Sequence, residues 1–201
     1  MATEIELKAH VKDSEALKIL LSKKAEYSGS FEKEDTYWTS DMDLKLPPQG
    51  LRLRRETRCF PDGKREQTCI VTRKIKSIKD GIEINDEREF EVKPAEEFED
   101  FLGKIGLEIN LTKHKRGWSF YSEGINAELV EVEGLGWFVE LEILADSNFA
   151  DGALADGFHA DDKPVDSRPE EKERLLNFLD SLGIEREAIE SRFYSEMLKS
   201  K

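Results

Sequence analysis

The sequence contains few of the side chains that build disulfide frameworks, metal centres and nucleophilic sites. Its 201 residues include 2 cysteines and 3 histidines. Two cysteines cannot make a disulfide framework, so we expect reduced thiols at Cys59 and Cys69. His10, His114 and His159 are scattered along the chain without the spacing of metal ligands. The sequence therefore argues against a histidine-based metal or nucleophilic site.

Long apolar runs and an excess of positive charge are also missing. No stretch approaches the roughly 20 apolar residues that span a bilayer, and charges alternate from Met1 to Lys8, unlike in a secretory signal. Asp and Glu number 44 against 31 Lys and Arg, for a net charge of −13. A protein that coats nucleic acid without sequence preference needs a basic face to neutralise the phosphates. We therefore expect a cytoplasmic protein with neither a membrane nor a nucleic-acid polymer as its partner.

Alternation of charged and apolar residues is the pattern that dominates the chain, and its period of two indicates β-strands. Strands are expected at residues 4–11, 34–39, 51–56, 67–76, 87–92, 111–121, 125–132 and 137–144. Helices are expected at 14–21 and 94–105, and again at 169–182 and 186–199 in a C-terminal helical region, 169–199. Residues 146–168, rich in Ala, Asp and Gly, are expected to form a flexible acidic insertion. The length favours a single domain over 1–201.

The charges on the expected strands are sorted by sign. Side chains at i and i+2 share a face, which groups Arg52 with Arg54 and Glu140 with Glu142. A sheet with one solvated face also carries charges, but such a face tends to mix the two signs. The pattern repeats on six strands. We therefore predict an α+β fold, a closed eight-stranded antiparallel β-barrel (tunnel) with a charged interior, flanked by helices.

An ionic interior needs a charged guest, because isolated buried charges are costly. Carboxylates on neighbouring strands suit a hard divalent cation, Mg²⁺ or Mn²⁺. Rows of Arg and Lys suit phosphate oxygens. Together they point to a metal-bound polyphosphate, whose chemistry needs positioning and charge neutralisation rather than a nucleophilic side chain.

Several motifs, in chain order, resemble those of the CYTH family, also called triphosphate tunnel metalloenzymes. They are E-x-E-x-K at 4–8, D-x-Y at 35–37, L-R-x-R at 51–54, T-x-K at 72–74, E-x-E-V at 89–92, a K-x-R-like pair at 113–115 and V-E-G-L-G-x-F-x-E-x-E at 132–142. The last helix resembles the closing S-Y-x-x-L-L of the family. Lys115 replaces the arginine of K-x-R, and Val130 stands where relatives often have Asp.

The resemblance implies a tunnel domain spanning 1–201 that binds triphosphate together with Mg²⁺ or Mn²⁺. By position, the metal ligands would be Glu4, Glu6, Glu140 and Glu142. The triphosphate would be bound by Lys8, Arg52, Arg54, Lys74, Lys113 and Lys115. The catalytic set would be Lys8, Glu6, Glu89 and Glu91, with Lys8 orienting the reacting group and the last two glutamates facing the tunnel as further metal-side or water-orienting groups.

Three functions fit these residues. The first is a metal-dependent hydrolase that removes the terminal phosphate of inorganic triphosphate or of a nucleoside or thiamine triphosphate. The second is a class IV-like adenylate cyclase, which makes cyclic AMP and pyrophosphate from ATP. The third is a sensor that binds a nucleotide or polyphosphate without turnover. A homodimer formed through one side of the barrel also stays open.

Overall fold

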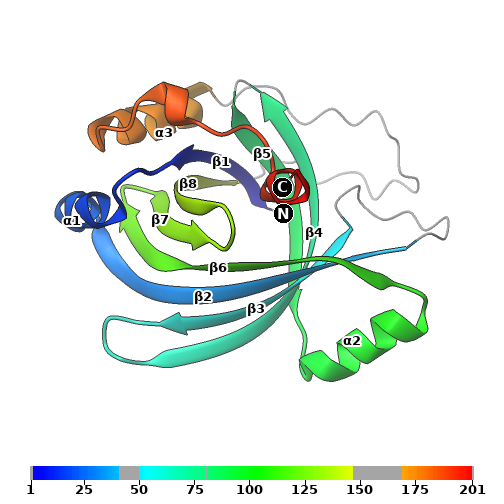
Figure 1. Ribbon diagram of the computed structural model, residues 1–201. Coiled ribbons are helices and arrows are strands. Elements are labelled where there is room, and N and C mark those ends of the chain that lie inside the picture. Colours follow the sequence, from blue (N-terminus) through cyan, green and yellow to red (C-terminus); the bar gives the residue numbers. More distant parts are fainter. Residues whose placement is uncertain (1, 41–49, 80, 147–168, 201) are drawn as a thin grey trace.

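Eight strands close into an antiparallel barrel in the order β1-β5-β4-β3-β2-β6-β7-β8, in a computed structural model that describes residues 2–40, 50–79, 81–146 and 169–200 (Figure 1). The strands are β1 (Ala2–His10), β2 (Glu26–Thr39), β3 (Leu51–Cys59), β4 (Arg65–Lys79), β5 (Ile82–Glu91), β6 (Glu108–Ser122), β7 (Ile125–Val132) and β8 (Gly136–Asp146). The predicted fold class is confirmed. The acidic insertion expected within 146–168 lies outside the described residues from 147 onward, as do residues 47–49 and 80 of two expected turns.

The expected strands are all present, and β7 has the predicted bounds. The largest difference is β2, expected at 34–39 but 14 residues long in the structure. It pairs along its length with β6 and over much of it with β3. The segment Glu26–Ser30 shows no apolar alternation, so only the pairing with neighbouring strands reveals that it is extended.

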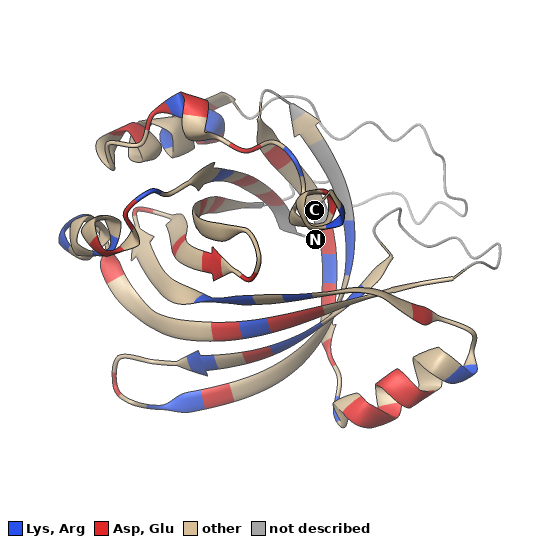
Figure 2. Ribbon diagram, viewed as in Figure 1, with Lys and Arg blue, Asp and Glu red and all other residues tan. Residues whose placement is uncertain are grey.

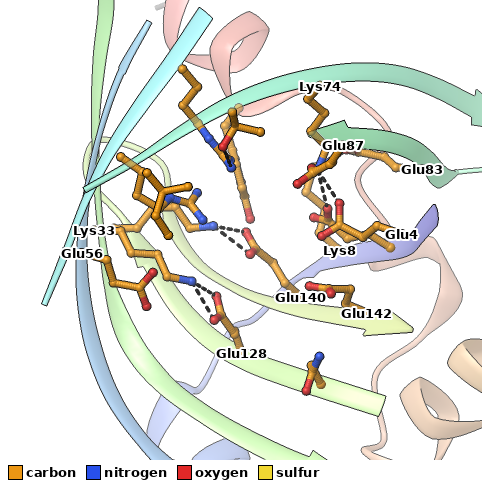
Figure 3. A pocket seen from close by; sticks show the side chains of 18 of the residues that line it. Glu4, Lys8, Lys33, Glu56, Lys74, Glu83, Glu87, Glu128, Glu140 and Glu142 are labelled. Atoms are coloured by element: carbon orange, nitrogen blue, oxygen red, sulfur yellow. Dashed lines mark hydrogen bonds and ion pairs between the residues drawn. The ribbon is translucent and has the colours of Figure 1, made fainter. Parts of the chain in front are cut away.

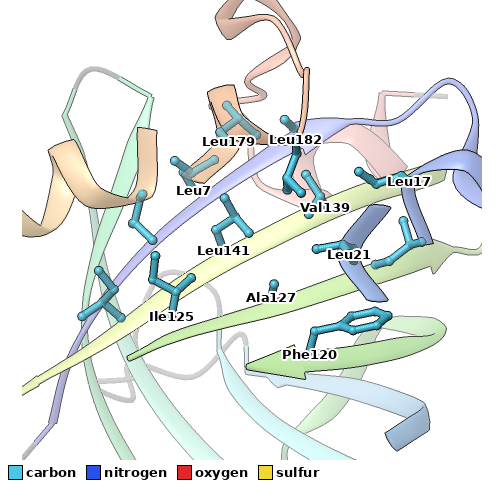
Figure 4. Close-up of a cluster of buried hydrophobic side chains, with 14 of the residues drawn as sticks. Leu7, Leu17, Leu21, Phe120, Ile125, Ala127, Val139, Leu141, Leu179 and Leu182 are labelled. Carbon is cyan, nitrogen blue, oxygen red and sulfur yellow. The ribbon is translucent and has the colours of Figure 1, made fainter. Parts of the chain in front are cut away.

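Apolar side chains on the outside of the barrel are covered by α1 (Ser14–Lys24) and α3 (Pro169–Ser181). Figure 4 shows Leu179 and Leu182 lying over Leu7 and its neighbours on β1 and β8. The buried members of this cluster are Ile5, Leu7, Ala9, Leu17, Leu21, Ile82, Phe120, Ile125, Ala127, Leu129, Val139, Leu141, Ile143, Leu175, Leu179 and Leu182. The hydrophobic core therefore lies outside the barrel wall, which leaves the interior to polar side chains.

A second apolar cluster holds α2 (Ala95–Lys104) against β3 and β4. Leu102 of this helix packs with Trp38, Leu53 and Val71 from the outer face of the barrel. Among the helices of the described chain, none is long and apolar enough to cross a membrane.

The C-terminal region differs from the expectation of one helix over 186–199. It forms a short 3-10 turn, Arg186–Ala188, then an extended segment, then α4 (Tyr194–Lys199). The cause is an open strand edge: β5 pairs with β1 only as far as Glu6. Beyond that point Ile189 bridges to Ala9, and the N–H of Glu190 donates to the carbonyl of Lys8 at 2.9 Å.

Helix α4 closes the barrel at the end where β1 and β7 terminate and β8 begins. Its Tyr194 and Met197 pack against apolar side chains from inward-facing strand positions. Those strand residues are Phe31, Val130, Val132 and Phe138. The interior is thus apolar at this end and ionic along the rest of its length.

Candidate active site inside the barrel

The barrel encloses a cavity of about 740 Å³ that side chains from all eight strands line. Its charged lining comprises the glutamates Glu4, Glu6, Glu56, Glu83, Glu87, Glu89, Glu128, Glu140 and Glu142, and the cations Lys8, Lys33, Arg52, Arg54, Arg58, Lys74, Lys113 and Lys115. Figure 2 shows both signs recurring along the strands. The two signs nearly balance inside, so almost all of the net charge of −13 belongs to the rest of the chain.

The basic side of the cavity is organised around Asp35, which is fully buried. Arg54 donates two hydrogen bonds to its carboxylate, at 2.6 and 2.9 Å. The ammonium of Lys113 lies 3.1 Å from the same carboxylate and donates to the Tyr37 hydroxyl at 3.1 Å. Burial alone would raise the pKa of Asp35, but Arg54 and Lys113 hold it well below its ordinary value. Asp35 therefore stays charged and draws both cations to this side of the cavity.

Two further lysines are paired with glutamates on β7 and β8 (Figure 3). Lys115 donates to both carboxylate oxygens of Glu140, at 2.8 and 2.7 Å. Lys33 binds Glu128 in the same way, at 2.7 and 2.8 Å. The pKa of Glu140 would rise on burial, but the ammonium of Lys115 holds it below its ordinary value.

Lys74 lies on the acidic side of the cavity (Figure 3). Its Nζ is 2.5 Å from Glu4 and 3.6 Å from Glu6, and it also pairs with Glu87. Burial would lower the pKa of Lys74, but Glu6, Glu4 and Glu87 raise it well above its ordinary value. This lysine, expected to bind phosphate, is instead surrounded by carboxylates.

Crowding of carboxylates shifts several pKa values on this side. Burial, then the charges of Glu4 and Glu6, raise the pKa of Glu142 to about 9. Burial, then the charge of Glu83, raise the pKa of Glu6 to about 7. Burial acts in the same direction on Glu4, but Lys74 outweighs it and the pKa falls to about 2. The cluster holds more carboxylates than one ammonium can neutralise.

Most of the expected site residues come together in this cavity. They are Glu4, Glu6, Lys8, Arg52, Arg54, Lys74, Glu89, Lys113, Lys115, Glu140 and Glu142. Lys8 is buried and donates to Glu83 at 2.6 Å. Glu89 lies near the surface, 43% exposed, and accepts hydrogen bonds from Arg52 and Thr72. Glu91 is outside the lining: its side chain pairs with Lys93 and is 46% exposed. The structure therefore does not bring Glu91 to the other members of the expected catalytic set.

Other residues of the cavity were not expected as site residues. Glu83 lines the cavity, and Asn85 is buried next to it with its Nδ2 on Glu4. Both lie on β5 before the recognised motif, but they share the face of Glu87 and Glu89 at spacing i, i+2. Glu128 shares a face with Val130, and only Glu128 reaches the ionic part of the cavity. The same spacing rule, continued along β5 and β7, would have found them.

The donor chemistry fits a divalent cation, although no group of three acidic, histidine or cysteine side chains in the described chain forms a ready-made metal site. The supporting observation is Asn85, which is completely buried. Its Nδ2 donates to Glu4 at 3.0 Å, while its Oδ1 has no hydrogen-bond partner in the structure. The amide oxygen of Asn85 and the oxygens of the crowded carboxylates are hard donors, the kind that a divalent cation prefers. Glu4, Glu6 and Glu142 would hold it together with Asn85.

Comparisons with known proteins agree with this geometry. The family model of the CYTH domain matches residues 2–194. The chain belongs to the CYTH family. No curated protein matches it in sequence.

Solved structures show that this CYTH chain shares its fold with proteins of several organisms. PH1819 from Pyrococcus horikoshii OT3 is 25% identical, with a TM-score of 0.73 and 98% of each chain covered. An adenylate cyclase candidate from Vibrio parahaemolyticus is 19% identical, with a TM-score of 0.66, over 98% of this chain and 97% of the other. HpAC1 from Hippeastrum, described as having a dominant triphosphatase activity, is 17% identical, with a TM-score of 0.62, over 100% and 96%.

Proposed function

We propose that the protein is a divalent-metal-dependent hydrolase that removes the terminal phosphate of inorganic triphosphate or of a nucleoside or thiamine triphosphate. The observation that supports this most directly is the cavity, in which cations from β1, β2, β3, β4 and β6 converge beside a carboxylate cluster. Such an arrangement matches a polyanion that carries a metal ion. The described triphosphatase activity of HpAC1, a protein of the same fold, agrees with this reading.

Each cation would bind substrate by exchanging partners. Lys8, Lys113 and Lys115 each contact one or two acceptors of the protein and would move to phosphate oxygens that carry more charge. Arg52 presents a planar fork, and Glu89 holds one of its nitrogens at 3.0 Å. We therefore assign Glu89 to orienting Arg52.

The bound metal would supply neutralisation of the phosphate charge and polarisation of the phosphoryl group. The residues of the chain supply position. Buried cations in a low-dielectric cavity stabilise the charge that develops on phosphate oxygens much more than they would in water. Attack by water on the terminal phosphorus would then release orthophosphate.

Phosphorus NMR tests the proposal. The protein is incubated with Mg²⁺ or Mn²⁺ and either inorganic triphosphate or ATP. We expect orthophosphate, with pyrophosphate as the second product of inorganic triphosphate. Cyclic AMP and pyrophosphate from ATP would identify a cyclase instead. Binding without any product would identify a sensor.

A matched pair of variants tests the site. Glu6→Gln removes a carboxylate from the cluster inside the cavity and is expected to lower kcat at least 100-fold, in the range of a lost electrostatic group (about 10²–10³). Glu131→Gln makes the same change outside the barrel, where Glu131 pairs with Arg116, and is expected to leave kcat within about twofold. Full activity in Glu6→Gln would show that the site is assigned wrongly.

A further inference from the structure

Among the expected phosphate-binding cations, Lys74 is the one that contacts two of the carboxylates expected to bind metal, Glu4 and Glu6. Its ammonium contacts Glu4 at 2.5 Å, Glu6 at 3.6 Å and Glu87, and its side chain is 13% exposed. Of the other cations, Arg54 and Lys113 pair with Asp35 and Lys8 pairs with Glu83, while Lys115 pairs with Glu140, a further expected metal ligand. Lys74 therefore occupies the place where the metal ion is expected.

An ammonium and a divalent cation would compete for the same oxygens here. Glu4 and Glu6 are both expected metal ligands, and Asn85, whose Nδ2 donates to Glu4, has a buried Oδ1 without a partner in the structure. Two cations so close together repel strongly in a cavity of low dielectric constant. Metal binding at these carboxylates therefore requires the ammonium of Lys74 to leave them.

The Lys74 ammonium would find a second binding partner on its own face of the sheet. It shares the inward face of β4 with Thr72, whose hydroxyl accepts a hydrogen bond from Arg52 at 2.8 Å. Its four-carbon stem is flexible, unlike the doubly bonded fork of Arg54. A phosphate group held by Arg52 would offer the released ammonium an anionic partner on the same face.

We propose that Lys74 couples the two ligands: it blocks the cation site until metal-bound triphosphate enters, then releases the carboxylates to the metal and binds a phosphate oxygen. This inference rests on the proposed function for the identity of the anion. Metal alone must displace Lys74 without giving it a new partner, and triphosphate alone must draw it away from unneutralised carboxylates. Triphosphate gives the displaced ammonium a partner, and the metal neutralises the carboxylates that the ammonium leaves. The two ligands therefore bind with positive cooperativity, and each raises the affinity for the other by the same factor.

The experiment compares Lys74→Met with Lys113→Met, because both remove one lysine from the cavity and differ in the carboxylates they contact. Mn²⁺ binding to the apo protein is measured by calorimetry and by electron paramagnetic resonance. The measurement is repeated in the presence of an inorganic triphosphate analogue with methylene bridges, which resists hydrolysis. Thermal melts of each variant establish that it is folded, and Lys74→Gln serves as the second substitution if Lys74→Met fails to fold.

We expect Lys74→Met to bind Mn²⁺ alone about tenfold more tightly than the unmodified protein, and to lose most of the coupling between Mn²⁺ and the analogue, which is typically about 5–150-fold in such systems. Lys113→Met is expected to weaken analogue binding and to leave the affinity for Mn²⁺ alone within about twofold. Unchanged or weaker Mn²⁺ binding in Lys74→Met would overturn the inference. So would equal tightening in both variants, since that would reflect only the total charge of the cavity.

The outcome is separable from that of the proposed function. The binding measurements require no turnover. A protein that shows the coupling but forms no product is a sensor with the lysine exchange intact. A protein that hydrolyses triphosphate without the coupling retains the proposed function and loses this inference.

Discussion

Asn85 shows how a single side chain can indicate a ligand. Its side chain is completely buried, its amide nitrogen is used by Glu4, and its carbonyl oxygen is unpaired among the residues that the structure describes. Leaving such a group unsatisfied costs about 1–3 kcal/mol. A cation beside Glu4 would satisfy it.

Asn85→Ala is therefore expected to weaken Mn²⁺ binding about tenfold, in the range seen for residues that support metal ligands (about 10–100-fold). Asn85→Asp keeps the shape and adds a charged oxygen, so it is expected to tighten Mn²⁺ binding. Calorimetry at fixed pH measures both. Equal affinities in the two variants would show that residue 85 does not face the cation.

Glu142 makes stability depend on pH. Burial and the neighbouring carboxylates raise its pKa from 4.5 to about 9, and that of Glu6 from 4.5 to about 7. The folded protein therefore holds protons that the unfolded chain releases above pH 4.5, and stability falls as the pH rises. Both residues contribute between pH 5 and 7, and Glu142 continues to contribute between pH 7 and 9. Burial also raises the pKa of Glu87, which acts in the same direction. The pKa of Glu4 is lowered from 4.5 to about 2, so Glu4 makes stability depend on pH only below pH 4.5.

Chemical denaturation of the metal-free protein between pH 7 and 9 is expected to show a loss of about 1 kcal/mol per pH unit, close to the limit for one proton. Glu142→Gln mimics the protonated side chain and is expected to remove this slope and to raise Tm by several degrees at pH 8. A slope that persists in Glu142→Gln would assign the proton to another group.

At the scale of elements, α4 joins the structural core to the site. The ring of Tyr194 is buried, and the ammonium groups of Lys8, Lys113 and Lys115 lie 5.5, 5.3 and 5.4 Å from its centre. Cations at this distance from an aromatic face are attracted to it. Helix α4 therefore closes the apolar end of the barrel and also positions three of the lysines expected to bind phosphate.

Tyr194→Ala is expected to lower the free energy of unfolding by about 3 kcal/mol, as for other buried aromatic side chains. For a chain of this size, Tm then falls by about 6–12 °C. Affinity for triphosphate is expected to fall as well, because the three lysines lose their common contact. Tyr194→Phe keeps the ring and is expected to retain most of the affinity. If both variants bind triphosphate equally well at a temperature where both are folded, α4 has only a structural role.

Elements with a regular pattern could be predicted from the sequence, and elements defined by a neighbour could not. The alternation at 125–132 predicted β7 with its observed bounds. The apolar spacing of Ile189, Phe193 and Met197 fits a helix equally well, yet the open edge of β1 at Ala9 makes Ile189 extended. That edge is open because β5 stops pairing with β1 before Ala9, and β5 lies some 100 residues before Ile189 in the sequence.

The same division applies to the site. Which face of a strand carries charge follows from the two-residue period, so the inward residues of β1, β3, β6 and β8 could be predicted. Which charges meet depends on how the strands are staggered around the closed barrel. Lys74 of β4 reaches Glu4 of β1 across the intervening β5, and Lys33 of β2 reaches Glu128 of β7 across β6. No motif in the sequence encodes these pairs.

At the scale of the whole molecule, closure of the barrel determines how a ligand bound in the cavity (the guest) affects the free energy of unfolding. All eight strands line the cavity, and the hydrophobic clusters lie mainly outside the wall. A guest bound to cations and carboxylates of several strands therefore cross-links the ring from within. At a concentration of 100 Kd it would stabilise the protein by about 2.7 kcal/mol.

Hydrogen exchange distinguishes this global effect from a local one. With Mn²⁺ and the methylene-bridged analogue we expect slower exchange in all eight strands, because opening the barrel at any seam releases the guest. Exchange in α2 is expected to change little, since this helix packs on the outer face through Leu102 and does not line the cavity. Protection confined to β1 and β8 would show that the guest binds one wall and that the barrel opens elsewhere without releasing it.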